Sequence, residues 1–173
     1  MKRKSVLAWL GVVVLVALVL VPGSAAALAM RVAFSGYEVP LGPPVDYGDW
    51  IELPSGNIHV RGMISQYQEV ATDPRMSGLN TSVMNATWGR DFAGPMWGTS
   101  ESVLSDSGDC PGGGVWQGTW TGMMSVDGSY SYSAVGKGIS GCVAGLRFSL
   151  TAFNPGGEAP TTYTGEILNP HGE

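Results

Sequence analysis

The stretch Gly114–Met124, GVWQGTWTGMM, decides the fold more than any other part of this sequence. Intervals of two residues separate Trp116, Gly118, Trp120 and Gly122. Alternate residues of a β-strand point to the same side, so this spacing places both indoles on one face of a strand. Glycine in a strand costs stability unless the backbone bends or approaches a neighbour closely. The segment therefore predicts a curved strand whose tryptophans either fill the interior of a barrel or line a cavity in it.

The alternating pattern extends in both directions from this segment. Asp127-Gly128 separates it from a second alternating run and is the strongest hairpin signal in the chain. Past residue 30, Gly or Pro interrupts nearly every run of ten residues. In between, β-branched and aromatic residues alternate with small or polar ones, which indicates strands. We predict eight strands, at residues 32–39, 57–70, 79–89, 95–104, 114–126, 129–138, 144–153 and 161–168.

Short connections rich in turn residues join these predicted strands, so consecutive strands are expected to be antiparallel neighbours. The pattern predicts an all-β domain, an antiparallel up-and-down eight-stranded barrel that leaves no edge unpaired. An open sandwich is the alternative. We expect residues 41–55, LGPPVDYGDWIELPS, to form a loop across one end, where Tyr47 and Trp50 plug the barrel or guard an entrance.

The N-terminus has the three parts of a secretory signal peptide: a basic start (MKRK), an apolar run at 6–21 and small residues up to Ala29. We predict cleavage near Ala29, which makes 1–29 a signal peptide and 30–173 a single secreted or periplasmic domain. The alternative is an uncleaved membrane anchor, although the run is shorter than the roughly 20 residues of a spanning helix.

Cleavage would leave a strongly acidic domain. Lys2, Arg3 and Lys4 are removed, so six of the nine basic residues and all 14 acidic residues remain, and the net charge changes from −5 to −8. Such a surface neutralises few phosphates, which argues against nucleic acid and against anionic membranes as partners. In an oxidising compartment the only two cysteines, Cys110 and Cys142, are expected to form a disulfide rather than a reactive thiol pair.

Few residues offer catalytic chemistry. His171 lies at the C-terminus, where we expect a frayed end, and His59 alternates with Arg61. These two form an acid/base and anion-binding pair only if their face is the barrel interior; otherwise they lie on the outer polar face. No metal-ligand constellation is present. We expect solvated carboxylates at Glu38, Glu52, Glu69, Glu101 and Glu166, and exposed polar side chains at the glycosylation-type sequences of Asn80 and Asn85.

Four tryptophans are the candidate ligand-binding residues, because all lie in predicted strands beside glycine: Trp88, Trp97, Trp116 and Trp120. Together with the methionines they either pack the barrel solidly or line a cavity for an apolar or aromatic ligand.

The run G-x-W-x-G-x-W-x-G, followed by Asp127-Gly128, Gly136-Lys137-Gly138 and AGLRF at 144–148, resembles small exported bacterial β-barrel proteins of unassigned function. Their general shape is similar to the allene oxide cyclase and dirigent barrel group, which is calycin-like. The resemblance implies an eight-stranded barrel, a hydrophobic cavity and homo-oligomers such as trimers. It carries over no active-site residue.

We therefore expect an exported β-barrel that binds a small apolar or aromatic ligand, without catalysis, cofactor or metal. Two alternatives stay open. An isomerase or cyclase would require His59 and Arg61 to point inward, and a structural or surface-interaction protein would require a filled interior.

Overall fold

The computed structural model describes residues 29–170. Residues 1–28 of the predicted signal peptide and the C-terminal His171 lie outside this range. Within the described range, no helix is long and apolar enough to cross a membrane.

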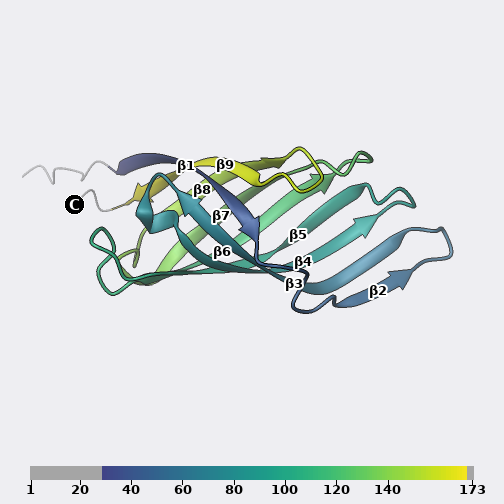
Figure 1. Ribbon diagram of the computed structural model, residues 1–173, viewed down its shortest axis with the longest axis horizontal. Helices are drawn as coiled ribbons and strands as arrows, with labels where there is room; N and C mark the ends of the chain where they lie inside the picture. Colours follow the sequence, from purple (N-terminus) through teal and green to yellow (C-terminus); the bar gives the residue numbers. More distant parts are fainter. Residues whose placement is uncertain (1–28, 171–173) are drawn as a thin grey trace, which may run out of the picture.

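Nine antiparallel strands make up most of the described chain (Figure 1). They are β1 (Met30–Pro40), β2 (Asp49–Glu52), β3 (Ile58–Ala71), β4 (Gly78–Trp88), β5 (Gly94–Leu104), β6 (Gly114–Met124), β7 (Tyr130–Gly141), β8 (Arg147–Asn154) and β9 (Thr161–Asn169), with a short 3-10 helix η1 (Pro74–Met76) between β3 and β4. All eight predicted strands are confirmed, with boundaries that differ by a few residues.

Eight of the strands form a barrel-like ring. Each strand from β3 to β9 pairs with its sequence neighbour, and β1 joins the two ends of this series. Residues 30–38 of β1 pair with β9, and residues 36–40 pair with β3. The ring therefore closes through β1, which pairs with β9 along its first part and with β3 along its last part.

The ninth strand is a correction to the sequence analysis. Residues 41–55 do not form a loop across the ring, because β2 pairs with the first residues of β3 and extends the sheet at one end. Trp50 packs against Trp88 with ring centroids 5.6 Å apart, whereas the Tyr47 side chain is exposed. The strand was missed because it has only four residues and prolines at 43, 44 and 54 flank it, which is typical of a loop.

Strand alternation places the glycine and tryptophan row of β6 as predicted, with Trp116 and Trp120 both facing inward. Glycines on the neighbouring strands make room for the interior rings. A Cβ atom on Gly98 would lie 2.9 Å from the Trp120 ring, and one on Gly136 would lie 2.3 Å from the Phe148 ring. Both distances are too short for a real side chain, so these glycines let the aromatic rings lie flat against the backbone.

One end of the ring is closed by a packed core. Trp116 is 1% exposed, and its ring meets Phe148 edge-on at 5.2 Å between centroids. The indole Nε1 donates a hydrogen bond of 2.6 Å to the carbonyl of Arg75. Cys110 and Cys142 form the predicted disulfide at this end, joining the β5–β6 connection to the chain just after β7.

Removing this disulfide is expected to lower the free energy of unfolding by about 4 kcal/mol, because it closes a loop with a sequence separation of 32 residues. The Cys110→Ala/Cys142→Ala double variant tests this by urea unfolding, and reductant added to the wild type is expected to give the same loss. Identical unfolding midpoints with and without the bond would contradict the prediction.

Candidate functional site: a cavity over a buried carboxyl pair

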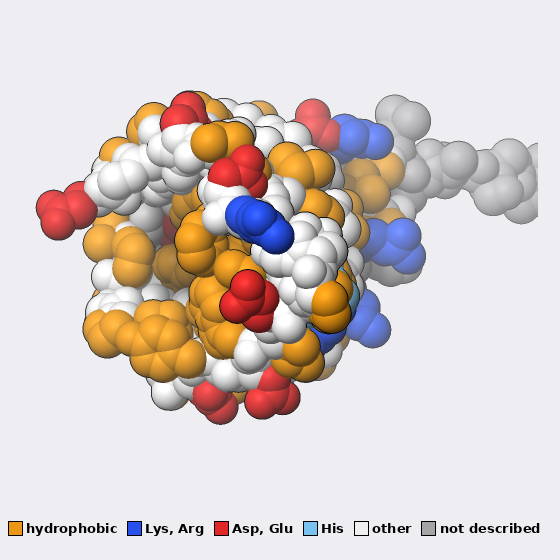
Figure 2. Space-filling view, turned by 90° about the vertical axis from the view of Figure 1, so that its right-hand side faces the viewer, with side chains coloured by type: hydrophobic (Ala, Val, Ile, Leu, Met, Phe, Trp, Pro, Cys, Tyr) orange, Lys and Arg blue, Asp and Glu red, His pale blue; other side chains and the backbone are white. Residues whose placement is uncertain are grey.

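The opposite end of the ring is hollow. A cavity of about 210 Å³ opens between the strand ends there, and Figure 2 shows hydrophobic side chains lining the hollow. The apolar part of the lining, here called the mouth, consists mainly of methionine and tryptophan side chains: Met63, Met84, Trp88, Met96, Trp120 and Met124. The ring is therefore filled at the end that holds the disulfide. It is open at the other end, where the β4–β5, β6–β7 and β8–β9 connections lie.

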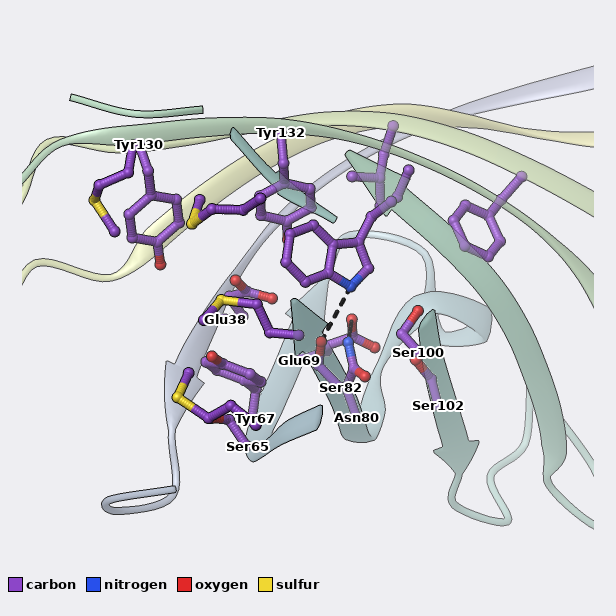
Figure 3. A pocket seen from close by; sticks show the side chains of 18 of the residues that line it. Glu38, Ser65, Tyr67, Glu69, Asn80, Ser82, Ser100, Ser102, Tyr130 and Tyr132 are labelled. Atoms are coloured by element: carbon purple, nitrogen blue, oxygen red, sulfur yellow. Dashed lines mark hydrogen bonds between the residues drawn. The ribbon is translucent and has the colours of Figure 1, made fainter. Parts of the chain in front are cut away.

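Two glutamates form the centre of the polar floor of this cavity. Glu38 of β1 and Glu69 of β3 are direct cross-strand partners, and their exposed fractions are only 5% and 7%. Figure 3 shows both side chains pointing into the cavity from one wall, with Tyr130 and Tyr132 reaching toward them from the other. Like charges directly opposite each other in a sheet are destabilising, so this pair is an unusual use of two interior positions.

Burial raises the pKa of both carboxyls to about 7. For Glu38, the nearby charge of Glu69 raises the pKa further, while hydrogen bonding to Tyr132 and Thr161 lowers it. For Glu69, the side chains of Ser102 and Asn80 oppose the effect of burial. Lys, Arg and His are absent from the lining residues, within the described part of the chain. Near neutral pH the pair is therefore only partly ionised, and the cavity wall supplies no basic partner for it.

Three tyrosines of the cavity lining surround the carboxyl pair as neutral phenols. Burial raises the pKa of Tyr67 to about 12 and that of Tyr132 well above its usual value, and it also raises the pKa of Tyr130. The Tyr130 hydroxyl forms a hydrogen bond of 2.6 Å with the Thr161 hydroxyl. These phenols remain protonated throughout the physiological pH range and act as hydrogen-bond donors or acceptors.

Two buried acceptor atoms on the cavity floor have no hydrogen-bond partner within residues 29–170. Asn80 donates a hydrogen bond of 2.8 Å from Nδ2 to Oε1 of Glu69, which leaves Oε2 of Glu69 and Oδ1 of Asn80 without donors. Buried polar atoms are almost always paired. A molecule inside the cavity can therefore donate hydrogen bonds to these two floor atoms, and it can accept one from the indole Nε1 of Trp88, which lines the cavity and is also buried without a partner.

The four predicted tryptophans have different positions. Trp88 and Trp120 line the cavity, and Trp116 lies in the closed-end core. Trp97 instead lies on the outer face, because it alternates with the inward-facing Met96 of β5. The guanidinium of Arg61 covers the Trp97 ring at 5.2 Å from its centroid.

His59 and Arg61 lie on the outer face, so the condition for their catalytic role is not met. Val60 between them is fully buried, and Arg61 donates a hydrogen bond to the Ala86 carbonyl. Strict alternation along β3 would place Met63 on the same face as His59 and Arg61. It points into the cavity instead, because a β-bulge between Val60 and Met63 reverses the alternation.

Three polar residues that we expected to be solvated are buried instead. Glu38 and Glu69 form the carboxyl pair, and Asn80 is 8% exposed beside them, so its glycosylation-type sequence is enclosed in the folded chain. Asn85 is half-buried and accepts a hydrogen bond from the Gly62 amide. Residues 29–170 contain no group of three or more His, Cys, Asp or Glu side chains that could hold a metal ion.

The chain has no match among protein-family models, curated proteins or solved structures.

Proposed function

We propose that this protein is an exported binding protein that holds a small ligand in the interior cavity and does not transform it. The observation that carries this proposal is a hollow ring end with an apolar mouth over a floor of buried, unpaired acceptors. Ligand pockets generally combine a mostly apolar lining with a few convergent polar groups. A purely structural role would favour a filled interior, and a cavity of about 210 Å³ argues against it.

We also propose that the ring is an up-and-down barrel with the general shape of the allene oxide cyclase and dirigent group. Its closure by the β1–β3 pairing supports this description. The intramolecular disulfide indicates an oxidising environment outside the cytosol. Secretion through the predicted signal peptide accounts for that environment.

Filling the cavity is expected to abolish ligand binding. Ser100 lines the cavity on β5, whereas its neighbour Thr99 is exposed on the outer face. A ligand found by thermal-shift or native mass-spectrometry screening of small amphiphiles should bind the Ser100→Phe variant at least about tenfold more weakly than the wild type. The Thr99→Phe variant adds the same ring outside and should bind normally.

A screen without any binder, or unchanged binding by a folded Ser100→Phe variant, would overturn the proposed function. Circular dichroism confirms that the variant is folded, since an added ring in a packed interior costs about 1–3 kcal/mol.

A second candidate function is an isomerase or cyclase that uses the carboxyl pair instead of His59 and Arg61. It is favoured by the pKa values of about 7 at Glu38 and Glu69, which suit proton transfer near neutral pH. Mass spectrometry or chromatography of the ligand after incubation separates the two candidates. A recovered ligand of unchanged structure supports binding, and a rearranged product supports catalysis.

A further inference from the structure

We propose that the ligand is an organic amine, which places its ammonium group between Glu38 and Glu69 and its apolar body against the indoles and methionines of the mouth. This inference rests on the proposed function, because it names the chemical class of the ligand in the same cavity.

The first argument is the charge of the cavity floor. Glu38 and Glu69 face each other across two paired strands, and the lining residues include no cation to balance them. Two arginines of the described chain form ion pairs with other carboxylates and not with this pair: Arg31 binds Glu166, and Arg75 binds Asp73. A positive ligand supplies the missing charge, whereas a carboxylate or phosphate ligand would be repelled.

The second argument is the number of hydrogen-bond donors that the floor requires. Oε2 of Glu69 and Oδ1 of Asn80 are buried acceptors without donors from the described chain. An ammonium group carries three donors and no acceptor, whereas an alcohol carries one donor. A primary ammonium is thus the simplest group that satisfies both orphaned acceptors and still has a donor for Glu38.

The third argument is the aromatic wall around the carboxyl pair. Trp120 is held in place by a hydrogen bond of 3.1 Å from its Nε1 to the Ser82 hydroxyl, and its ring packs against Tyr132 at 5.8 Å (Figure 3). Aromatic faces attract cations within about 6 Å, most strongly when water is excluded. Further out, the flexible methionine side chains adapt to the shape of an apolar body.

Binding of an amine to this floor depends on pH through a defined set of groups. The titratable side chains that face the carboxyl pair are all tyrosines: Tyr67 of β3, Tyr130 and Tyr132 of β7, and Tyr163 of β9. Burial raises the pKa of each of them, so they remain neutral, and Glu38 and Glu69 alone change charge near pH 7. Amine affinity should therefore fall as the pH decreases through this value.

Calorimetry with two matched probes tests this inference on protein purified from a host that exports it. Phenethylamine and phenethyl alcohol have almost the same shape and differ in charge. At about pH 8 the amine should bind at least about tenfold more tightly than the alcohol, and this preference should shrink at about pH 5.

Two carboxyl variants complete the experiment. Glu69→Gln removes the charge but keeps the shape, and it should weaken amine binding about tenfold while alcohol binding stays within about twofold. Glu38→Gln should behave in the same way if Glu69→Gln does not fold. Glu101→Gln alters an exposed carboxylate on β5 and should change neither affinity.

The outcomes separate the two proposals. If the alcohol binds as tightly as the amine, or if Glu69→Gln leaves amine affinity unchanged, the amine inference is overturned and the proposed binding function stands. If neither probe nor any amphiphile of the wider screen binds, the proposed function fails as well.

Discussion

Acidification from about pH 8 to about pH 5 is expected to stabilise the ligand-free protein by about 3 to 5 kcal/mol. The cause is the carboxyl pair, since burial raises the pKa of Glu38 and of Glu69 from 4.5 to about 7. Between these two values the folded protein holds protons that the unfolded chain has released, so stability increases as the pH falls through 7 toward 4.5. Each shift corresponds to about 3 kcal/mol, and mutual repulsion makes the effect of the pair smaller than the sum.

Urea unfolding at the two pH values measures this effect, and the Glu38→Gln/Glu69→Gln double variant should remove most of it. The variant should also be more stable than the wild type at about pH 8, because it no longer buries charge. Asp73 lies outside this window, since Arg75 lowers its pKa below 3.8 and its contribution is lost only in stronger acid. Glu101→Gln is the control and should keep the wild-type pH dependence. Wild-type stability that stays constant or decreases on acidification would contradict the burial of the pair.

Truncation of Trp116 to alanine should lower the free energy of unfolding by about 3–5 kcal/mol. The side chain is 1% exposed at the closed end, and its loss leaves a cavity beside Phe148. It also leaves the Arg75 carbonyl without the indole donor that ties the β3–β4 connection to β6. Thermal and urea unfolding both report the change.

Trp97 provides a matched control for this prediction. It lies one strand away on the outer face and is 37% exposed, so Trp97→Ala should cost about 1 kcal/mol, mainly from the lost contact with Arg61. Equal losses from the two substitutions would contradict the assignment of inner and outer faces.

The fold could be predicted from local patterns because alternation and turn chemistry are encoded in short segments. The glycine and tryptophan row of β6 identified its inner face correctly, and Asp127-Gly128 identified the following hairpin. The bulge after Val60 was not predictable in the same way. It inserts one residue whose effect is visible only against the register of β4, and it moved Met63 into the cavity.

The carboxyl pair could not be predicted, because alternation does not say which face of a strand is the interior. Three of the four strand neighbours of the glutamates are apolar and partly exposed: Tyr37, Val39 and Val70 are about 40% exposed on the outer face, and the fourth neighbour is the exposed Gln68. A reader of the sequence would place these apolar residues inside and the glutamates outside. Phe34, in phase with Glu38 on β1, and Tyr67, in phase with Glu69 on β3, pointed the other way.

The most direct test of the carboxyl pair as a ligand-binding floor is a carbon-13 NMR titration of the glutamate side chains, without and with phenethylamine. In the free protein two glutamate carboxyls should titrate near pH 7. Saturation with the amine should lower both pKa values, because the ammonium stabilises the ionised forms. Glutamate carboxyls that all titrate near their ordinary value of about 4.3 in the free protein, or that do not respond to the amine, would contradict the account.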